Sequence, residues 1–385
     1  MKIGLLGFGV VGTGVYDIIV SGTTPELSDI EVKRIISLVV PEGFEHLVTK
    51  DINDIVNDDE IELVVEAMGG LHPAYEFVMA CIEKGKHVVS SNKHLVSNYF
   101  VELHEAAVKN GVQLRFTPST GGGIPWLSSL KRARRSDEIE ELWGIVNGTT
   151  NFILDSMLKE NTDFDVALRE AQRLGYAEAD PSADIDGLDT QRKCIISANL
   201  AFDAIVKEES VPVFGIRNIT HDDVEYFTNN GMVCKLFANA GRNEDGSIYA
   251  YVAPVLLDKS SLEAGVDSNY NSITYVGKFV GRSTYMGQGA GKFPTGNSVV
   301  QDILDTMFDD ATLKREYNSV EVNNSLNLHK YYVRTMGKLE AFLDIVEKEE
   351  GNSRYITKPV SIACIKALSE ELYKDCPQSF FAQIK

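Results

Sequence analysis

The chain has 385 residues, of which 44% are hydrophobic and 24% are charged, a composition typical of a globular protein. This length exceeds a single ordinary hydrophobic core and predicts two or three domains. The formal net charge of -19 opposes contact with phosphates, and no run approaches the roughly 20 apolar residues that cross a bilayer. We therefore expect a cytoplasmic protein with neither a nucleic-acid nor a membrane partner.

The five cysteines are widely spaced, their number is odd, and no C-x-x-C pattern occurs. The sequence therefore predicts neither a disulfide framework nor a zinc site. The N-terminal run MKIGLLGFGVVGTGV is rich in glycine and lacks a small-residue cleavage site. It predicts a buried strand rather than a signal peptide.

The first part of the chain alternates short apolar runs with helical patterns. Strands are predicted at 2–6, 32–40, 61–66, 87–90 and 112–116, and helices at 10–20, 73–84 and 100–109. Such alternation predicts a parallel sheet with helical crossovers. We expect an α/β fold with a Rossmann-type nucleotide-binding domain over residues 1–125. A helix within 297–325 is expected to return to it.

The pattern changes after this domain. Strands are predicted at 138–146, 234–240, 248–257 and 272–276, and helices from near 149, at 164–174 and at 188–204. We expect residues 126–296 to form an α+β domain for substrate binding and dimerisation. Its apolar strands exceed what the few helices can cover, which predicts a homodimer or a higher homo-oligomer.

Three glycines lie between the first strand and the first helix, in the pattern G-x-G-x-x-G: Gly7, Gly9 and Gly12. The first permits a tight turn, the second lets a pyrophosphate approach the backbone, and the third lets helix and strand pack closely. The helix N-terminus offers N–H groups to phosphate. The alternative is a purely structural turn.

The choice between NAD and NADP depends on the end of the second strand. Val39 and Val40 end that predicted strand, Glu42 follows, and no arginine does. A carboxylate there accepts the ribose 2′-hydroxyl, whereas a 2′-phosphate needs a cation. Glu42 therefore favours NAD, although it also fits a solvated loop charge.

The run GYAEADPSADIDGLDTQRK, residues 175–193, concentrates carboxylates before a lysine. Asp186 is predicted to cap a helix, which places Asp189 and Lys193 at i and i+4 on one face. Burial near a helix start is expected to lower the pKa of Lys193, which suits proton transfer at an alcohol or carbonyl oxygen. The alternative is a capped helix with an ordinary surface ion pair.

Two loops at the carboxyl ends of predicted parallel strands are candidate ligand sites. One contains Gly69 and Gly70, and the other contains Lys93 within SSNKHLVS. The predicted cofactor-binding residues are Gly7, Gly9, Val10, Val11, Gly12, Gly69, Gly70, Ser91, Asn92, Lys93 and Gly289.

Over residues 1–325 the chain resembles the homoserine dehydrogenases. The motifs are GFGVVG at 7–12, SSNK at 90–93, GGGIP at 121–125, NGTTNFIL at 147–154, the acidic run at 175–193 and GQGAGKFPTGNSVVQDI at 287–303. The resemblance implies that the chain interconverts aspartate semialdehyde and homoserine with NAD(P). It implies that Lys193 and Lys93 transfer protons, that Asp189 positions Lys193, and that Glu178 and Asp184 bind the substrate.

The chain departs from this family at one position. The family commonly has a glutamate four residues before the glycine triplet and uses it, with backbone carbonyls, to hold a monovalent cation. Thr117 takes that position here. The charged ligand is missing, so the sequence assigns no metal ligand and does not by itself predict a bound sodium ion.

Two other classes fit parts of the pattern. Related semialdehyde and glyceraldehyde-phosphate dehydrogenases use a nucleophilic cysteine, but no cysteine here has a recognisable nucleophile setting. A non-catalytic nucleotide sensor would have no need for Lys93, Glu178, Asp184, Asp189 and Lys193 together.

Residues 326–385 resemble a shortened ACT-type βαββαβ unit. Strands are predicted at 329–335 and 379–385, and helices at 339–347 and 361–372. Residues 348–360 leave little room for two strands and their turns, so only one strand is predicted, at 354–360. We therefore expect an incomplete effector pocket and no ordinary feedback control by threonine.

Overall fold

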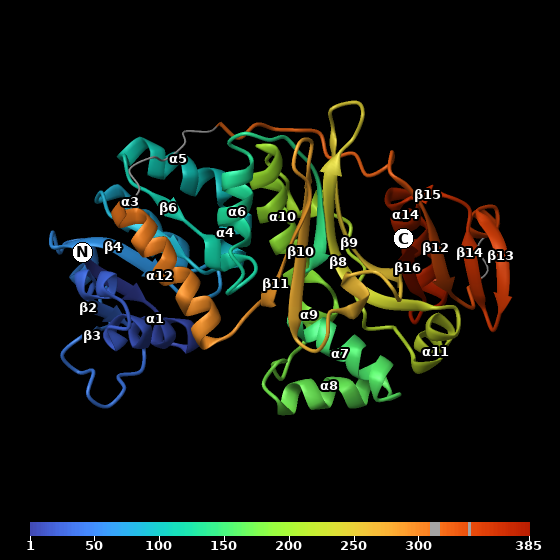
Figure 1. Ribbon diagram of the computed structural model, residues 1–385, viewed down its shortest axis with the longest axis horizontal. Coiled ribbons are helices and arrows are strands. Elements are labelled where there is room, and N and C mark those ends of the chain that lie inside the picture. Colours follow the sequence, from blue (N-terminus) through green and yellow to red (C-terminus); the bar gives the residue numbers. More distant parts are fainter. Residues whose placement is uncertain (309–315, 338–339) are drawn as a thin grey trace. The chain divides into compact units, whose positions relative to one another are not determined.

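The computed structural model describes residues 1–308, 316–337 and 340–385, and the chain divides into two compact units (Figure 1). Unit 1 comprises Met1–Arg132 and Gln288–Asn318. Unit 2 comprises Ala133–Gly287 and Ser319–Lys385, so the C-terminal segment that was predicted as a separate part lies within it.

Unit 1 contains a parallel sheet. Its strands are β1 (Lys2–Leu6), β2 (Glu31–Ile36), β3 (Val48–Thr49), β4 (Ile61–Glu66), β5 (His87–Ser90) and β6 (Leu114–Arg115). Among the described residues their order is β3-β2-β1-β4-β5-β6. This is the strand order of dinucleotide-binding Rossmann folds, which confirms the predicted fold class.

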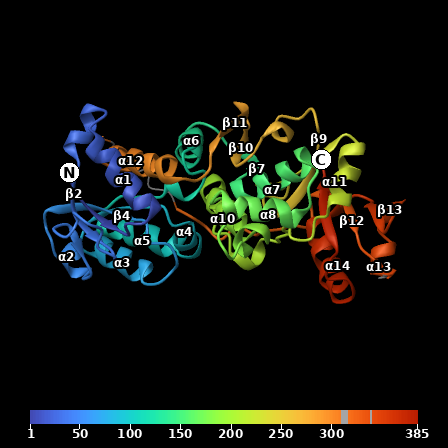
Figure 2. The same ribbon diagram turned by 90° about the horizontal axis from the view of Figure 1, so that it is seen from below.

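Helices cover both faces of this sheet (Figure 2). The helices of this part of the chain are α1 (Val10–Ser21), η1 (Pro25–Asp29), α2 (Asn53–Val56), α3 (Ala74–Glu83), α4 (Lys93–Asn98), α5 (Phe100–Asn110), η2 (Thr117–Ser119), α6 (Trp126–Ala133) and α12 (Lys292–Phe308). Because side chains alternate along a strand, Leu5 packs in the cluster with α1 and α12, and Leu6 in the cluster with α3 and α5.

The second strand is shorter than predicted. It ends at Ile36, and Leu38 and Val39 are 89% and 72% exposed instead of buried. The predicted position of Glu42 directly after the strand is therefore wrong, because Glu42 lies in an exposed turn further along the chain. The apolar run was mistaken for strand because hydrophobicity alone does not show where a chain leaves a sheet.

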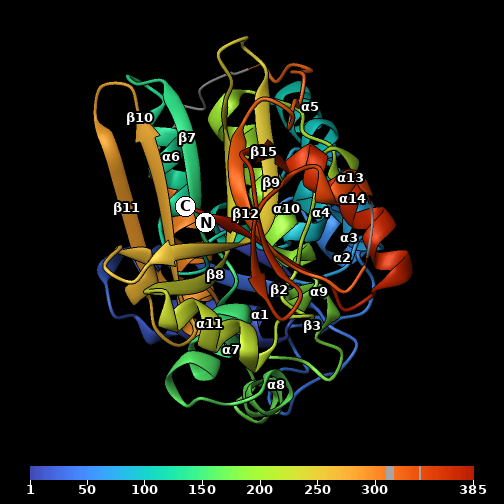
Figure 3. The same cartoon turned by 90° about the vertical axis from the view of Figure 1, so that its right-hand side faces the viewer.

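Unit 2 is built on a larger sheet. Its strands are β7 (Ile139–Ile145), β8 (Met232–Arg242), β9 (Ile248–Asp258), β10 (Tyr270–Gly277), β11 (Gly281–Gln288), β12 (Leu328–Arg334), β13 (Val346–Gly351), β14 (Arg354–Thr357), β15 (Val360–Ser361) and β16 (Phe380–Ile384). The described strands follow the order β11-β10-β7-β8-β9-β16-β12-β14-β13, and β15 pairs with β12. Strand β11, which was not predicted, forms one edge (Figure 3).

The helices of unit 2 include the predicted ones at 164–174 and 188–204. They are α7 (Gly148–Lys159), α8 (Phe164–Arg173), α9 (Ser182–Ile185), α10 (Leu188–Phe202), η3 (Glu208–Ser210), α11 (His221–Asn229), η4 (Glu263–Gly265), α13 (Glu340–Leu343) and α14 (Ile362–Asp375). Helices α7, α10 and α11 contact β8, and both β8 and β9 are buried along almost their whole length. The expectation that these strands lack cover within one chain is therefore wrong. In the described part of the chain, no helix has the length and apolar character that a membrane span requires.

The C-terminal segment contains a two-strand hairpin where the sequence predicts a single strand. Helix α13 ends at Leu343, and β13 begins at Val346, inside the helix predicted over 339–347, whose first residue lies outside the described ones. Gly351, Asn352 and Ser353 all have positive φ and close the turn to β14 tightly. The described residues of this segment thus have the order β12-α13-β13-β14-β15-α14-β16, and the argument from length for an incomplete effector pocket no longer applies.

Candidate active site

The turn between β1 and α1 has two positions that only glycine can occupy. Gly7 has a φ of 103°, and a Cβ there would lie 2.6 Å from the Ala67 carbonyl oxygen. A Cβ on Gly12 would lie 2.2 Å from the Gly7 carbonyl oxygen. The predicted tight turn and close helix approach therefore both occur.

The start of α1 is open at Gly9, its N-cap residue. A Cβ on Gly9 would meet no atom within 4 Å, no side chain caps the helix, and the first turn holds no acidic residue. Val10 is exposed, and Val11 packs partly into the core. The first N–H groups of a helix bind phosphate, so this turn fits the pyrophosphate of a dinucleotide.

A buried carboxylate, which the sequence analysis did not single out, joins the loops after β4 and β5. Glu66 accepts hydrogen bonds from Met68 N (2.9 Å) and Ser90 Oγ (2.6 Å). Asn92 Nδ2 donates to Glu66 Oε1 (3.2 Å) and to the Gly70 carbonyl oxygen (2.7 Å). Burial raises the pKa of Glu66, and these hydrogen bonds oppose that effect. The side chain of Asn92 therefore holds the loops together.

The remaining predicted residues of these loops lie beside that carboxylate. Gly69 and Gly70 have φ values of 77° and 73°, in the left-handed region. Ser91 donates its backbone N–H to the carbonyl at the end of β4 (3.0 Å). Lys93 is half-buried and is the first residue of α4.

The segment that precedes α12 packs closely on the glycine-rich turns of unit 1. A Cβ on Gly122 would lie 2.4 Å from the carbonyl of Gly289, a predicted cofactor residue. A Cβ on Gly14 would lie 2.2 Å from the Lys292 carbonyl oxygen, so α1 and α12 approach backbone to backbone.

Thr117, the residue that replaces the family's glutamate, lies in η2. Its backbone N–H donates to Asp302 Oδ2 (2.9 Å). Burial raises the pKa of Asp302 to about 6, against hydrogen bonds from the side chain and backbone of Thr117. Thr117 therefore brings a neutral hydroxyl group, not a carboxylate, to this position.

In unit 2, α10 carries the predicted lysine. Lys193 is 8% exposed, and its Nζ donates to Asp189 Oδ2 (2.7 Å) and to the Val146 carbonyl oxygen (2.7 Å). Asp189 is 4% exposed. The i, i+4 spacing thus gives a buried ion pair, not a surface one.

Asn147, which was noted only within a motif, links this pair to a second carboxylate. Its Oδ1 accepts from Thr150 N (2.8 Å) and caps α7. Its Nδ2 donates to Asp184 Oδ1 (2.7 Å) and to Asp189 Oδ2 (2.8 Å). An asparagine between a predicted strand and helix signals an N-cap, but not the partners of its amide group.

Asp186 does not cap α10 as predicted. The N-cap is Gly187 with a φ of 88°, and no side chain caps the helix. Asp186 instead ends α9 and binds Arg217, with Oδ1–Nε at 2.6 Å and Oδ2–Nη2 at 2.7 Å. Asp186 binds Arg217 and not the N-terminus of α10, because the guanidinium group offers two parallel N–H donors to the carboxylate.

Glu178 is not part of the hydrogen-bonded group that Asn147, Asp184, Asp189 and Lys193 form. The residue is exposed, and Gln172 Nε2 donates to its backbone carbonyl oxygen (3.1 Å). In the described part of unit 2, no hydrogen bond joins its carboxylate to Asp184, Asp189 or Lys193.

Cys194, next to the lysine, is fully buried and donates to the Asn239 carbonyl oxygen (3.4 Å). Burial raises the pKa of its thiol to about 12. A buried thiol that stays protonated is no nucleophile, which argues against the cysteine-dependent alternative.

Together, Val146, Asn147, Asp184, Asp189 and Lys193 form what we call the acid–lysine cluster. It combines a proton-carrying ammonium group with carboxylates that attract a cation. Such an arrangement suits proton transfer at the oxygen of a substrate that carries an ammonium group.

Comparisons with known proteins agree with this chemistry. The family model "Homoserine dehydrogenase, NAD binding domain" matches residues 7–117, and the model "Homoserine dehydrogenase" matches residues 125–304. A homoserine dehydrogenase from Synechocystis is 41% identical over 315 residues, which cover 79% of this chain and 72% of that one. One from Bacillus subtilis is 38% identical over 322 residues, 80% of this chain and 73% of the other.

A solved structure extends the likeness to the whole chain. The homoserine dehydrogenase from Thiobacillus denitrificans has a TM-score of 0.88 and 32% identity, covering 100% of this chain and 98% of that one. The glycine turn of unit 1 and the acid–lysine cluster of unit 2 thus occur in a chain that belongs to the homoserine dehydrogenase family of NAD(P)-dependent oxidoreductases.

Proposed function

We propose that this enzyme reduces aspartate semialdehyde to homoserine, with Lys193 as the group that gives a proton to the reacting oxygen. The observation that carries this assignment is the buried contact of Lys193 Nζ with Asp189 Oδ2 and the Val146 carbonyl oxygen. In the reverse direction the same nitrogen accepts the hydroxyl proton of homoserine.

The surroundings of Lys193 support this role. The adjacent carboxylate of Asp189 favours the ammonium form, which is the form that protonates a developing alkoxide. The Val146 carbonyl oxygen accepts a hydrogen bond from a second N–H group of the Lys193 ammonium, and this contact fixes the orientation of the amine. Asp189 is therefore assigned as the residue that positions Lys193 and balances its charge.

We assign the substrate ammonium group to Asp184 and Glu178. Asp184 is held by the Asn147 amide through one oxygen (2.7 Å), and the rigid contact keeps the carboxylate in place. Glu178 is exposed, so it is available to a ligand that arrives from solution. Lys93, which follows the carboxyl end of β5, is assigned to proton transfer together with Lys193.

The cofactor that fits unit 1 is a nicotinamide dinucleotide, which supplies the hydride when it is bound. Gly9 and the uncapped start of α1 would hold its pyrophosphate, and the loops joined by Glu66 and Asn92 would position it further. We propose a preference for NAD over NADP. The exposed residues that follow β2, Leu38 and Val39, offer no cation to a 2′-phosphate.

We also propose that catalysis needs no monovalent cation. Thr117 is engaged with Asp302 and brings no charge. The rate of the enzyme should be the same in sodium, potassium and tetramethylammonium salts at equal ionic strength. A rise of tenfold or more on addition of sodium would overturn this statement.

A homodimer remains our proposal for the assembly. Strand β11 is an edge of the sheet in unit 2, and Phe279, Val280 and Met286 on or before it are exposed. Apolar side chains along an unpaired edge favour association of two copies. Sedimentation that shows a stable monomer at micromolar concentration would contradict it.

One assay tests the central proposal. Oxidation of NADH and of NADPH is followed with aspartate semialdehyde, side by side. As a control, reduction of NAD⁺ and of NADP⁺ is followed with glyceraldehyde 3-phosphate and inorganic phosphate, because cysteine-dependent dehydrogenases oxidise their aldehyde. We expect turnover in the first assay alone, and a higher kcat/KM with NADH. Activity only in the control assay, or rapid inactivation by a thiol reagent that substrate prevents, would favour the cysteine-dependent class. A kcat/KM that is tenfold higher with NADPH would reverse the cofactor preference.

A further inference from the structure

The segment Phe214–Asn218, which we call the strap, lies directly against the turn that carries Asp184. The backbone N–H of Ile216 donates to the Ile185 carbonyl oxygen (2.7 Å). A Cβ on Gly215 would lie 2.2 Å from that same oxygen, so the two backbones touch. The strap and the turn therefore cannot shift independently.

Arg217 of the strap makes hydrogen bonds to residues at both ends of α9. Its Nε and Nη2 bind the two carboxylate oxygens of Asp186 (2.6 and 2.7 Å), and Nη2 also donates to Ser182 Oγ (3.1 Å). Ser182 begins α9 and Asp186 follows its end, and Asp184 lies between them. A helix of one turn has little stability of its own, so such outside contacts decide where it sits.

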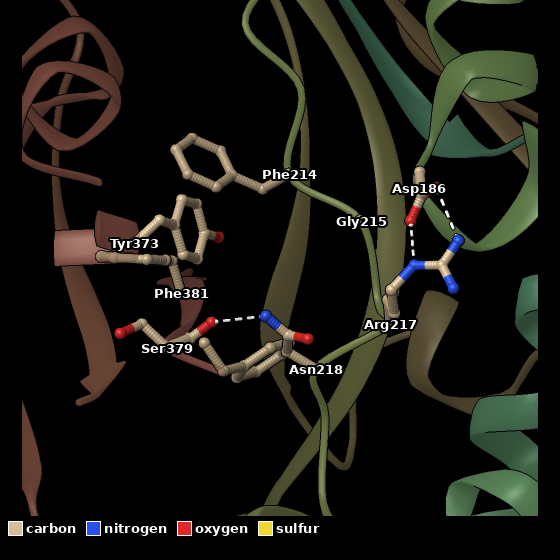
Figure 4. Close-up of a pocket in the computed structure, with 9 residues that line it drawn as sticks. Asp186, Phe214, Gly215, Arg217, Asn218, Tyr373, Ser379 and Phe381 are labelled. Atoms are coloured by element: carbon tan, nitrogen blue, oxygen red, sulfur yellow. Dashed lines mark hydrogen bonds and ion pairs between the residues drawn. The ribbon is translucent and has the colours of Figure 1, made fainter. Parts of the chain in front are cut away.

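The other side of the strap is bound to the C-terminal segment (Figure 4). Asn218 Nδ2 donates to the carbonyl oxygens of Pro377 (2.8 Å) and Ser379 (3.0 Å). Arg334 Nη2 donates to the Asn218 carbonyl oxygen (2.6 Å). The strap is thus tied to β12 and to the residues before β16.

On this side the strap is packed at Phe214, which is buried and whose ring centroid lies 5.5 Å from that of Phe381, but a space remains beside that contact. A cavity of about 130 Å³ lies between it and the C-terminal segment, with Phe214, Tyr373 and Phe381 among its lining residues. Figure 4 shows the three rings on one side and the Arg217–Asp186 pair on the other. Where side chains leave such a space, polar contacts fix the backbone, and these are the contacts of Arg217 and Asn218.

We propose that Arg217 is a positioning residue for substrate binding, acting through α9 on Asp184, and that Asn218 anchors it to the C-terminal segment. The inference rests on the proposed role of Asp184 in binding the substrate ammonium group. It adds Arg217 and Asn218, which lie more than 25 positions further along the chain, to the residues that position Asp184. Through Asn218, the C-terminal segment also helps to position this carboxylate.

The first experiment removes the ion pair. Arg217→Gln should raise the KM for homoserine about fivefold, the upper range for a partly exposed ion pair, with kcat and the KM for the nucleotide unchanged. Arg217→Lys keeps the charge and loses the paired geometry, so its KM should fall between the two. Lys330→Gln is the matched control, because it removes an ion pair of similar exposure from the C-terminal segment.

A double-variant cycle with Asp184→Asn tests the route of the effect. If Arg217 acts through Asp184, Arg217→Gln should add little to the homoserine KM once Asp184 is changed. An equal fivefold rise in both backgrounds would overturn the inference. So would a loss of kcat and of nucleotide affinity together with a lower melting temperature, because that pattern describes damage to the fold.

Asn218→Asp tests the anchor with almost no change in shape. It places a carboxylate against two carbonyl oxygens, so we expect the homoserine KM to rise in the same way, and an unchanged KM would remove Asn218 from the proposal. Failure of the proposed function would look different. In that case Asp184→Asn itself would leave the homoserine KM unaltered, whatever Arg217→Gln does.

Discussion

The nucleotide turn of unit 1 and the acid–lysine cluster of unit 2 are built from different parts of the polypeptide. In unit 1 the cofactor turn consists of backbone: the glycines of the β1–α1 turn and the open start of α1. In unit 2 the acid–lysine cluster consists of the side chains of Asn147, Asp184, Asp189 and Lys193, together with the Val146 carbonyl oxygen. A backbone site is sensitive to added volume, whereas a side-chain site is sensitive to changes of charge at constant volume. The predictions that follow test this contrast.

The largest effect is expected at Lys193. Lys193→Ala removes the proton donor, so kcat should fall by about 10²- to 10⁴-fold, while the KM for the nucleotide changes little. Steady-state oxidation of homoserine measures both. Lys235→Met provides a matched control, since Lys235 is also buried and also makes two hydrogen bonds, to Asn151 Oδ1 (2.9 Å) and to the Val266 carbonyl oxygen (2.7 Å). If the control lost as much turnover per folded molecule, the assignment of Lys193 would fail.

The glycine turn offers a pair of variants that differ only in where a methyl group is placed. Gly12→Ala collides with the Gly7 carbonyl oxygen, so it should lower the unfolding free energy by about 1–3 kcal/mol and nucleotide kcat/KM by about 10²-fold. Gly9→Ala meets no protein atom within 4 Å. It should keep its melting temperature and still raise the nucleotide KM, because the methyl group takes space intended for phosphate. A Gly9→Ala enzyme with normal nucleotide KM would show that the pyrophosphate lies elsewhere.

A substitution at Asn147 tests the acid–lysine cluster by a change of charge at nearly constant volume. Asn147→Asp keeps the cap of α7 but faces two carboxylates with a third, and the lost charged hydrogen bonds should lower kcat/KM for homoserine by about tenfold at neutral pH. Neighbouring carboxylates raise the pKa of the introduced carboxyl group. Its activity relative to the parent should therefore recover as pH falls, because the protonated form donates again. Asn147→Ala has no such proton, and the same recovery in that variant would contradict the explanation.

The sequence predicts the features that depend on neighbouring residues better than those that depend on contacts between distant ones. Glycine spacing and strand–helix alternation depend on neighbouring residues, and the β1–α1 turn was predicted from them at its correct position. The Asp189–Lys193 pair was also predicted, because i and i+4 share one helix face. The contact of Asn147 with Asp189 joins residues 42 positions apart, and Arg217 reaches Asp186 across 31. No local pattern encodes such contacts, which depend on how α7, α9 and the strap pack.

The errors in the fold also have local causes. The apolar residues after Ile36 are exposed, so hydrophobicity extended β2 too far. The polar run of β13 was not recognised as strand, because a strand near the end of a sheet tolerates charged side chains on both faces.

The last prediction concerns stability and pH, not turnover, and it involves the control lysine of unit 2. Lys235 is 1% exposed, and burial lowers its pKa to about 8, although the charges of Asp155 and Asp267 act in the opposite direction. In the unfolded chain a lysine has a pKa of about 10.4. Between these two values the unfolded chain binds more protons than the folded one, so the unfolding free energy rises with pH, by up to about 1.4 kcal/mol per unit. Below pH 8 both states are protonated and the slope from this group vanishes. Urea unfolding of the parent and of Lys235→Met from pH 7 to pH 10 isolates the contribution of Lys235 to the unfolding free energy, because all other titrating groups are common to both proteins. The parent should gain stability relative to the variant from about pH 8 upward, and a constant difference across the range would show that Lys235 titrates normally in the folded protein.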